Sequence, residues 1–545
     1  MTPLRLLAHI RGLAGIASLA SMLFVAHIAP AQIAVTTYHN DNYRTGWNSA
    51  ESALTPTTVG TSSFGLLAKV AVDDQVDAQP LVVPGVNITA GKNQGIHDVV
   101  YIATGNDTVY AIDADAGTVL LSQNLGKPVT WPLGCNNNGP NVGIDSTPVI
   151  DVSGNTIYLI AYTQDSTGPA YRIHALDLGN LTDKVTPMVV SASHTLTDGT
   201  TFTFNATYQR QRPGLLLANG NVYAGFGSFC DYSANLSRGW LLGWNAATLA
   251  PLSANRLNNQ QATSPDSFFL SSIWMSGYGL AADDSGNIVF VTGNSDYSGT
   301  TYDGVSNIQE SVVKVSSDLT TVVDLFTPSN QSTLDQGDVD FGSGGVLVLP
   351  DQPGSAPHLA VAAGKYGSLY LMNEDKLGGY STIKNNVLGT YQVGACWCGE
   401  SYFVDPNDGA ARVVTSGGQD VMVWKLQTSP SPKLAGVTHS PALRSGQLPG
   451  FFTSVSSNGN ATPIIWALTR PLSQSSTAVG LYAFNPESSG KVMTLLFHSN
   501  AGAWPNFGGD LNQVPVVANG KVYVATNKQL QIFGLKQQKG SKPSK

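Results

Sequence analysis

Charged residues are scarce in this chain of 545 residues. Asp, Glu, Lys and Arg make up only 12% of it, about half of the roughly 25% in an average globular protein. This excludes a charged disordered tail, a long coiled coil and a protein that binds nucleic acid by neutralising many phosphates. Glutamate is rarest, with five residues against 31 aspartates. Because Glu favours helix interiors and Asp favours turns, we expect a β-rich chain with few long surface helices.

Long hydrophobic runs are also missing, apart from one near the N-terminus. Arg5 and Arg11 lead into an apolar stretch over residues 12–25, and Ala29-Pro30-Ala31 follows as a small-residue cleavage pattern. The stretch is short for a membrane span of ~20 residues, so we interpret residues 1–31 as a cleaved export signal. We therefore expect a periplasmic or extracellular protein that has no membrane span once the signal is removed.

Positive charge is in deficit as well. The formal net charge is -8, and loss of two arginines with the signal takes it to -10. An acidic exported protein is a poor partner for nucleic acid or for an anionic membrane surface. We expect instead a small-molecule ligand or a protein partner in the cell envelope.

Cysteine is limited to four residues, which an oxidising compartment allows to form disulfides. Of the three possible pairings we favour Cys135–Cys230, whose long loop is worth about 4–5 kcal/mol in the chain-entropy model. Cys396 and Cys398 are too close in sequence for a relaxed bridge, although a strained one is possible. Metal binding is the competing interpretation, but the spacings match no common zinc pattern.

A short β-branched strand recurs along the whole chain. Its copies are centred near residues 101, 158, 223, 290, 360, 413, 465 and 523, at intervals of 52 to 70 residues. An apolar strand precedes most copies and an alternating strand follows them, as in Pro80–Val83 and Val109–Asp113 around the first copy. Alternation with period two marks strands with one buried face. Together with a further strand, this unit makes the four-stranded blade of a β-propeller.

We therefore predict an all-β fold, an eight-bladed β-propeller of four-stranded antiparallel blades. Seven blades are the alternative, since the copies near 413 and 465 have weaker flanks. The last copy lacks its fourth strand because the sequence becomes Lys- and Gln-rich after Leu535, whereas residues 64–72 form a surplus strand before the first copy. Pairing the surplus strand into the last blade would leave no open sheet edge. The chain then divides into the signal (1–31), an N-terminal entry arm (32–63), the propeller (64–535) and a basic tail (536–545).

Several segments carry a resemblance to a known family. The run from His97 to Tyr101, its continuation from Tyr110 to Gly117, and the entry segment from Tyr38 to Gly46 are similar to segments of quinoprotein alcohol dehydrogenases. The stretch from Gln211 to Gly345 resembles uncharacterised exported bacterial proteins with PQQ-like repeats more closely still. The resemblance implies an exported, eight-bladed propeller that holds pyrroloquinoline quinone (PQQ) with a calcium ion on its axis.

The sequence departs from the pattern of that family in three ways. The first blade ends in Leu120-Leu121, where the enzymes place a Trp, and the adjacent Cys-Cys pair that stacks on the cofactor is absent. No Cys-x-x-Cys-His motif occurs, so no haem is expected. The fold can therefore be shared while the chemistry is not.

The loops that lead into the first strand of each blade converge on the axis of a propeller. Here they carry acids, arginines and tryptophans, which can form a polar ligand site with stacking surfaces. A quinone would need a cation held by carboxylate and amide oxygens, an aspartate base and a flat aromatic partner, and these residue types are present. The candidate ligand- or cofactor-binding residues are Arg210, Arg212, Trp274, Trp397, Glu400, Asp510 and Asn512, and the candidate metal ligands are Asp338 and Asp340.

Each candidate also has a structural interpretation. The tryptophans could pack between blades, the arginines could bind backbone carbonyls of a neighbouring blade, and the acidic loop could be solvated. The sequence contains no motif of a serine hydrolase, a P-loop or a zinc protease, and no catalytic residue is assigned. We expect a propeller that presents an axial polar site to a small ligand or protein partner without catalysis. The alternative is a PQQ- and calcium-dependent dehydrogenase that oxidises an alcohol or a sugar.

Overall fold

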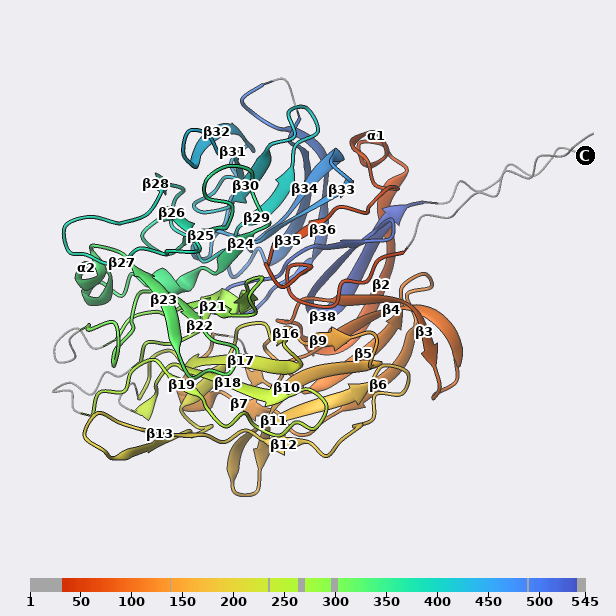
Figure 1. Ribbon diagram of the computed structural model, residues 1–545. Helices are drawn as coiled ribbons and strands as arrows, with labels where there is room; N and C mark the ends of the chain where they lie inside the picture. The colour runs from red at the N-terminus through yellow and green to blue at the C-terminus, as the bar shows by residue number, and fades with distance from the viewer. Residues whose placement is uncertain are drawn as a thin grey trace, which may run out of the picture. The chain divides into compact units, whose positions relative to one another are not determined.

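Eight small sheets surround a central axis in the computed structural model (Figure 1). The structure describes residues 32–137, 139–233, 236–262, 270–295, 302–487 and 490–536. The expected signal and all but the first residue of the expected basic tail lie outside these ranges. The α-helices α1 (Pro56–Val59) and α2 (Gln331–Gln336) are short. Within the described ranges, no helix has the length and apolar character needed to cross a membrane.

The sheets are the blades predicted from the repeat, and they number eight rather than seven. The first four consist of β3 (Leu81–Ile88), β4 (Gly95–Ala103), β5 (Thr108–Asp113) and β6 (Val119–Asn124); β9 (Val149–Asp151), β10 (Thr156–Asp165), β11 (Gly168–Asp177) and β12 (Met188–Val189); β15 (Gln209–Gln211), β16 (Leu216–Ala218), β17 (Asn221–Ser228), β18 (Trp240–Asn245) and β19 (Arg256–Leu257); and β20 (Ala281–Ala282), β21 (Ile288–Val291), β22 (Val312–Val315), β23 (Val322–Thr327) and β27 (Gly379–Tyr380).

The last four blades follow the same order along the chain. They consist of β24 (Val346–Leu349), β25 (Leu359–Ala363), β26 (Ser368–Asn373) and β28 (Gly389–Gln392); β29 (Ser401–Val404), β30 (Ala411–Thr415), β31 (Met422–Gln427) and β32 (Lys433–His439); β1 (Trp47–Asn48), β33 (Thr453–Asn458), β34 (Ala461–Thr469), β35 (Ala478–Asn485) and β36 (Thr494–Ala503); and β37 (Val516–Ala518), β38 (Lys521–Leu535) and β2 (Phe64–Gln75). Two small hairpins lie between blades, β7 (Val129–Thr130) with β8 (Asn141–Val142) and β13 (Ser193–Thr195) with β14 (Thr201–Thr203).

The expected four strands per blade are not kept everywhere. The third blade has both β15 and β16 beside β17. The fourth and seventh blades gain β27 and β1, which pair parallel to their neighbours, and the last blade has three strands because β38 is 15 residues long. The predicted ring closure is confirmed. Leu66 of β2 pairs with Phe533 of β38, and Val70 pairs with Leu530, so the surplus N-terminal strand completes the last blade.

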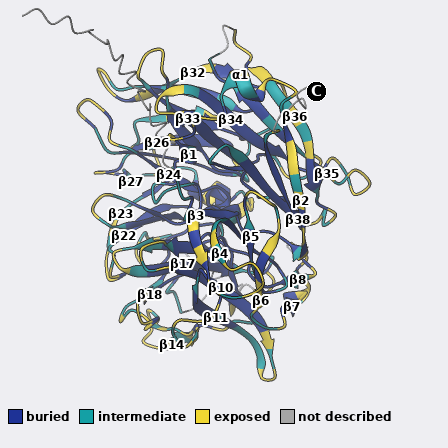
Figure 2. Ribbon diagram, turned by 90° about the vertical axis from the view of Figure 1, so that its right-hand side faces the viewer, coloured by how far each residue is buried: buried dark blue, intermediate teal, exposed yellow. Residues whose placement is uncertain are grey.

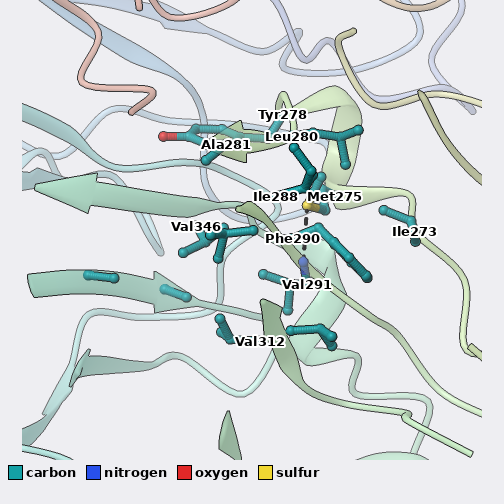
Figure 3. Packing of buried hydrophobic residues seen from close by; sticks show 14 of the residues in the cluster. Ile273, Met275, Tyr278, Leu280, Ala281, Ile288, Phe290, Val291, Val312 and Val346 are labelled. Atoms are coloured by element: carbon teal, nitrogen blue, oxygen red, sulfur yellow. Dashed lines mark hydrogen bonds between the residues drawn. The ribbon is translucent and has the colours of Figure 1, made fainter. Parts of the chain in front are cut away.

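Buried apolar residues fill the spaces between neighbouring blades, while exposed residues lie mainly on outer strands and loops (Figure 2). Tyr101 of β4 and Leu159 of β10 belong to one such cluster, and Val100 of β4 packs with Tyr523 of β38 across the closing seam. The cluster in Figure 3 joins the fourth blade to the fifth, with Phe290 and Val346 among its members. The β-branched residues of each second strand suit this packing because both faces of the blade are covered.

The entry arm forms hydrogen bonds with all eight blades. Its residues Tyr38, His39 and Arg44 are almost completely buried. The hydrogen bonds run around the ring: Val35 to Val82 of β3, Thr36 to Ile150 of β9, Asn42 to Leu217 of β16 and Ala282 of β20, Tyr43 to Val348 of β24, Thr45 to Tyr402 of β29, Gly46 to Val455 of β33, and Asn48 to Val517 of β37. The arm therefore fills the axis at one end and fastens all eight blades.

Candidate functional site

The loops before the first strands form a cavity of about 660 Å³. Seven blades contribute lining residues to it, from the second to the eighth. Eight of the nine site residues proposed from the sequence line this cavity: Arg210, Arg212, Trp274, Asp338, Asp340, Trp397, Asp510 and Asn512. Glu400 is not among the lining residues. The axial convergence of these loops thus brings together side chains that are far apart in the sequence.

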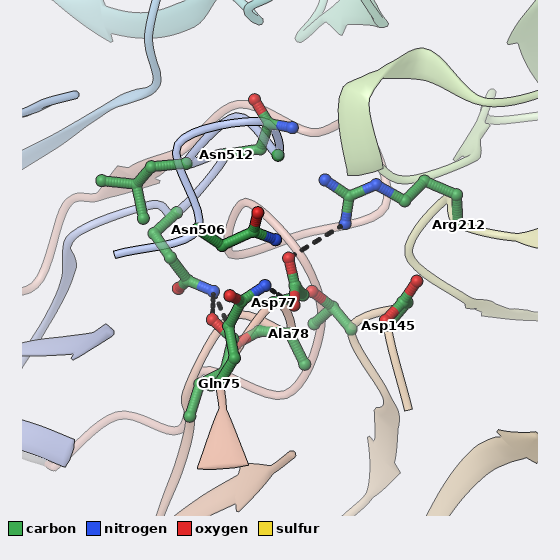
Figure 4. Close-up of polar contacts among 12 residues, drawn as sticks. Gln75, Asp77, Ala78, Asp145, Arg212, Asn506 and Asn512 are labelled. Carbon is green, nitrogen blue, oxygen red and sulfur yellow. Dashed lines mark hydrogen bonds and ion pairs between the residues drawn. The ribbon is translucent and has the colours of Figure 1, made fainter. Parts of the chain in front are cut away.

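The two arginines lie on one side of the cavity against buried aspartates. Arg210 Nη2 is 3.0 Å from Asp145 Oδ2, and Arg212 Nη1 is 3.7 Å from Asp77 Oδ1, a pair that Figure 4 shows. Burial and the neighbouring Asp145 raise the pKa of Asp77 to about 7, although Arg212 opposes this. The arginines are therefore held by carboxyl groups of the protein itself, which offset part of the positive charge that they bring to the cavity.

Lys365 lies between the two candidate metal ligands and the two tryptophans. Its Nζ is 2.9 Å from Asp340 Oδ2 and 3.2 Å from Asp338 Oδ1. The same atom is 5.5 Å from the ring centroids of both Trp274 and Trp397, which places it within cation–π range. Burial alone would lower the pKa of Lys365. The neighbouring carboxylates of Asp340 and Asp338 have the larger effect and raise this pKa above its ordinary value.

This ammonium stands where a cation held by Asp338 and Asp340 would be. It forms ion pairs with both carboxylates and occupies the position between them, which leaves them ill suited to the calcium ion that the sequence suggested. The part of the chain that the structure describes also has no cluster of three or more His, Cys, Asp or Glu side chains arranged to hold a metal. Because calcium requires six to eight oxygen ligands, the residues at the axis do not fit it.

We expect Lys365→Ala to open a cage that binds a free ammonium ion. Two indole rings and two carboxylates would then surround an empty cation position, which is the arrangement that recognises alkylammonium groups. Methylammonium chloride should raise the melting temperature of this variant, since a ligand that binds only the folded state stabilises it by mass action. The control is sodium chloride at the same ionic strength. An equal response of wild type and variant would show that Lys365 does not fill this position.

Asp231 was not predicted from the sequence. It lines the cavity from the loop between β17 and β18, and it accepts a hydrogen bond from Ser228 Oγ. Burial and the nearby Asp340 raise its pKa to about 6. Lys365 was missed in the same way, since it lies in the loop between β25 and β26. The Asp231 loop follows β17 and the Lys365 loop follows β25, whereas only the loops that lead into the innermost strands were considered as contributors to the site.

Disulfides and one buried arginine hold the cavity wall in place. The predicted bridge Cys135–Cys230 is confirmed, and Cys230 lines the cavity. Cys396 and Cys398 are also bonded to each other, on either side of Trp397. Arg470 donates from Nη2 to the backbone oxygen of Trp397, at 2.8 Å, and to Asn512 Oδ1 at 2.5 Å. These connections fix the lining side chains before any ligand binds.

Glu400 lies in the interior near the entry arm. It is buried beside Tyr278, whose hydroxyl donates to the backbone oxygens of Arg44 and Glu400. Neither carboxyl oxygen has a hydrogen-bond partner, and burial raises the pKa of Glu400 to about 8. Unlike the other site residues proposed from the sequence, Glu400 therefore lies apart from the lining of the cavity.

Comparison with known proteins gives a likeness of fold. No protein-family model matches this sequence, and no curated protein sequence matches it either. Among solved structures, the quinohemoprotein alcohol dehydrogenase ADHIIG from Pseudomonas putida is 12% identical, with a TM-score of 0.60 over 94% of this chain and 82% of that one.

Two further structures agree with it. The quinohemoprotein alcohol dehydrogenase from Comamonas testosteroni is 12% identical, with a TM-score of 0.60 over 95% of this chain and 83% of that one. A europium-containing methanol dehydrogenase is 10% identical, with a TM-score of 0.56 over 92% of this chain and 98% of that one. At such low identities the likeness concerns the fold alone. The chain has the eight-bladed β-propeller fold found in quinoprotein dehydrogenases.

Proposed function

We propose that this protein binds a neutral, polyhydroxylated ring, such as a saccharide, in its axial cavity and carries out no chemistry on it. One observation carries the proposal: each cationic side chain of the lining already pairs with a carboxyl group of the protein, while indole rings and planar polar groups remain to contact a ligand. Trp274 and Trp397 offer apolar surface against which the C–H face of a sugar ring can stack. The hydroxyl groups of a sugar are neutral, so they can bind without an unpaired charged side chain in the lining.

The polar lining suits hydroxyl groups. Asn512 accepts from Arg470 through its Oδ1, so its amide hydrogens can donate to a ligand oxygen. Asp510 and Asp231 can accept from ligand hydroxyls, since each carboxylate offers several acceptor positions. Asp510 otherwise accepts from the backbone N–H of Leu448 at 3.3 Å. A ligand held in this way is recognised by its pattern of hydroxyls and by its flat face.

A PQQ-dependent dehydrogenase is the competing function, because the fold is shared with quinohemoprotein alcohol dehydrogenases. PQQ carries three carboxylates, and the cavity lining holds four aspartates but only three cationic side chains. Those cations already contact Asp145, Asp77, Asp338 and Asp340. The residues at the axis therefore do not fit a trianionic quinone with calcium, and we derive no redox step.

We also place the mature protein outside the cytoplasm. The basic and apolar start of the sequence has the pattern of an export signal. Both bonded cysteine pairs support this placement, since disulfides persist in oxidising compartments. An envelope or extracellular location would bring the cavity into contact with saccharides.

The proposal is tested by calorimetric titration with glucose, N-acetylglucosamine, cellohexaose and chitohexaose. We expect at least one to bind, and Trp397→Ala to weaken it at least tenfold because a stacking face is lost. Asn512→Asp should also weaken binding, since it keeps the acceptor for Arg470 but removes the amide hydrogens. Trp424→Ala is the matched control, because Trp424 is also half-buried but does not line the cavity.

Two results would contradict the proposal. One is the absence of heat with all four saccharides. The other is tight uptake of PQQ with calcium, together with quinone absorbance and reduction of a dye by an alcohol or a sugar, which would establish the dehydrogenase instead.

A further inference from the structure

A second polar cavity, of about 290 Å³, lies beside the axial one. Its lining includes Asp74, Gln75, Trp131, Asn141, Asn506 and Asn527. Trp131 is 46% exposed, although its indole is large and apolar. An exposed indole among planar amide and carboxylate groups is the combination that the axial cavity also has. The composition therefore points to the same kind of ligand at both places.

Trp131 is held in position by its own segment. Its backbone N–H donates to the oxygen of Pro140 at 2.9 Å, and the same segment is tied to the third blade through Cys135–Cys230. Asn141 donates to Asp74 Oδ2 at 2.7 Å, which orders these two polar groups of the lining. The cavity is thus built on a segment that a disulfide restrains.

The two cavities share a wall. Asn137 and Gly508 line the axial cavity, whereas Gly139 and Asn506 line the second one. The two segments meet where Asn506 Nδ2 donates to the backbone oxygen of Asn136 at 3.4 Å. Each of these two segments therefore contributes one residue to the axial cavity and another to the second cavity. A ligand longer than one ring could reach both cavities.

A chain of polar side chains also connects the linings of the two cavities. Gln75, which lines the second cavity, donates from Nε2 to Asp77 Oδ2 at 2.8 Å. The other oxygen of Asp77 faces Arg212, which lines the axial cavity, and Figure 4 shows these side chains in a row. A single buried carboxyl group therefore contacts one lining residue of each cavity.

We infer that the Trp131 cavity is a second saccharide subsite, so that the ligand of this protein is a chain of sugar rings rather than a single ring. The inference rests on the proposed function of the axial cavity. One ring stacks at Trp397 and Trp274, and another ring of the same molecule stacks on Trp131. The hydroxyl groups of the second ring bind to Asn506, Asn527 and Asp74.

The test compares a monosaccharide with its hexasaccharide in calorimetric titrations, using N-acetylglucosamine with chitohexaose and glucose with cellohexaose. For the wild type we expect the hexasaccharide to bind at least tenfold more tightly. Trp131→Ala should remove this tenfold advantage and leave the monosaccharide affinity within twofold. Because Trp131 is exposed, its replacement should leave the melting temperature almost unchanged. Tyr380→Ala, which removes another partly exposed ring in the fourth blade, should alter neither affinity.

The outcomes separate the two proposals. If Trp131→Ala leaves the hexasaccharide affinity unaltered while Trp397→Ala weakens both ligands, the second subsite is wrong and the axial site stands. Equal affinities of wild type for monosaccharide and hexasaccharide also overturn the second subsite. If no saccharide binds to the wild type, the proposed function fails and this inference fails with it.

Discussion

Replacing Arg44 with methionine is expected to lower the free energy of unfolding by about 4–6 kcal/mol, close to the whole stability of many domains. The Arg44 side chain is fully buried in the entry arm. Its Nε donates to the oxygen of Leu280 at 2.7 Å and its Nη2 to that of Leu215 at 3.2 Å, while Nη1 donates to oxygens within the arm itself. Methionine would leave buried carbonyl oxygens of two blades without a donor.

The measurement is urea unfolding followed by circular dichroism. Arg172→Met is the control. Arg172 lies on β11 of the second blade and forms a partly exposed ion pair with Asp165 at the end of β10. Such exposed pairs contribute less than ~1 kcal/mol to the free energy of unfolding. Arg44→Lys should fall between the two, because an ammonium keeps the charge but not the planar set of donors. Similar losses for Arg44→Met and Arg172→Met would show that the arm does not fasten the ring.

The ring itself could be predicted from the sequence because its determinants are local and repeated. In each blade a strand rich in β-branched residues recurs at the same point of the repeat. Residues of these strands, such as Val100 and Phe290, are buried between blades. The closure could be predicted by a simple comparison of the two ends, since one blade lacked a strand and Phe64–Val72 was left over. A propeller is quasi-repetitive, so neighbouring blades pack by the same rule at every position.

The role of the entry arm could not be predicted in this way. His39, Asn40 and Arg44 have left-handed backbone conformations, with φ of 55°, 72° and 68°, which no periodic pattern indicates. The arm also bonds to carbonyl and amide groups of other blades rather than to particular side chains. Any residue type offers the same backbone groups, so the sequence of the blades does not indicate where the arm binds.

The candidate site could be predicted in part for a related reason. Loops before the first strands point to the axis in any propeller, which brought Arg212 and Trp397 to the cavity. Lys365 and Asp231 were missed because the loops after β25 and β17 also reach the axis here. Glu400 was misplaced because it directly precedes β29, where the chain has already turned from the cavity into the interior near Tyr278.

Replacing Glu400 with glutamine is expected to stabilise the protein at alkaline pH and to leave it unchanged at acidic pH. Burial raises the pKa of Glu400 from 4.5 to about 8, a change that corresponds to about 4–5 kcal/mol between the protonated and ionised forms. Because the folded state binds the proton more tightly, the contribution is fully present below pH 4.5 and is lost as the pH rises through 8. Glutamine is neutral at every pH and nearly the same shape, so it avoids this loss.

The decisive quantity is the difference in unfolding free energy between Glu400→Gln and wild type, measured by urea unfolding from pH 4.5 to pH 9. The difference isolates Glu400 from other buried acids, such as Glu310 and Asp107, whose pKa values burial also raises. It should be close to zero at pH 4.5 and reach about 4 kcal/mol near pH 8. Glu487→Gln, at a partly exposed glutamate that accepts a hydrogen bond from Asn407, should give a nearly flat difference. A flat difference for Glu400→Gln as well would mean that water or a counter-charge reaches this carboxyl group, and the interior around Tyr278 would then not be the dry region that its burial indicates.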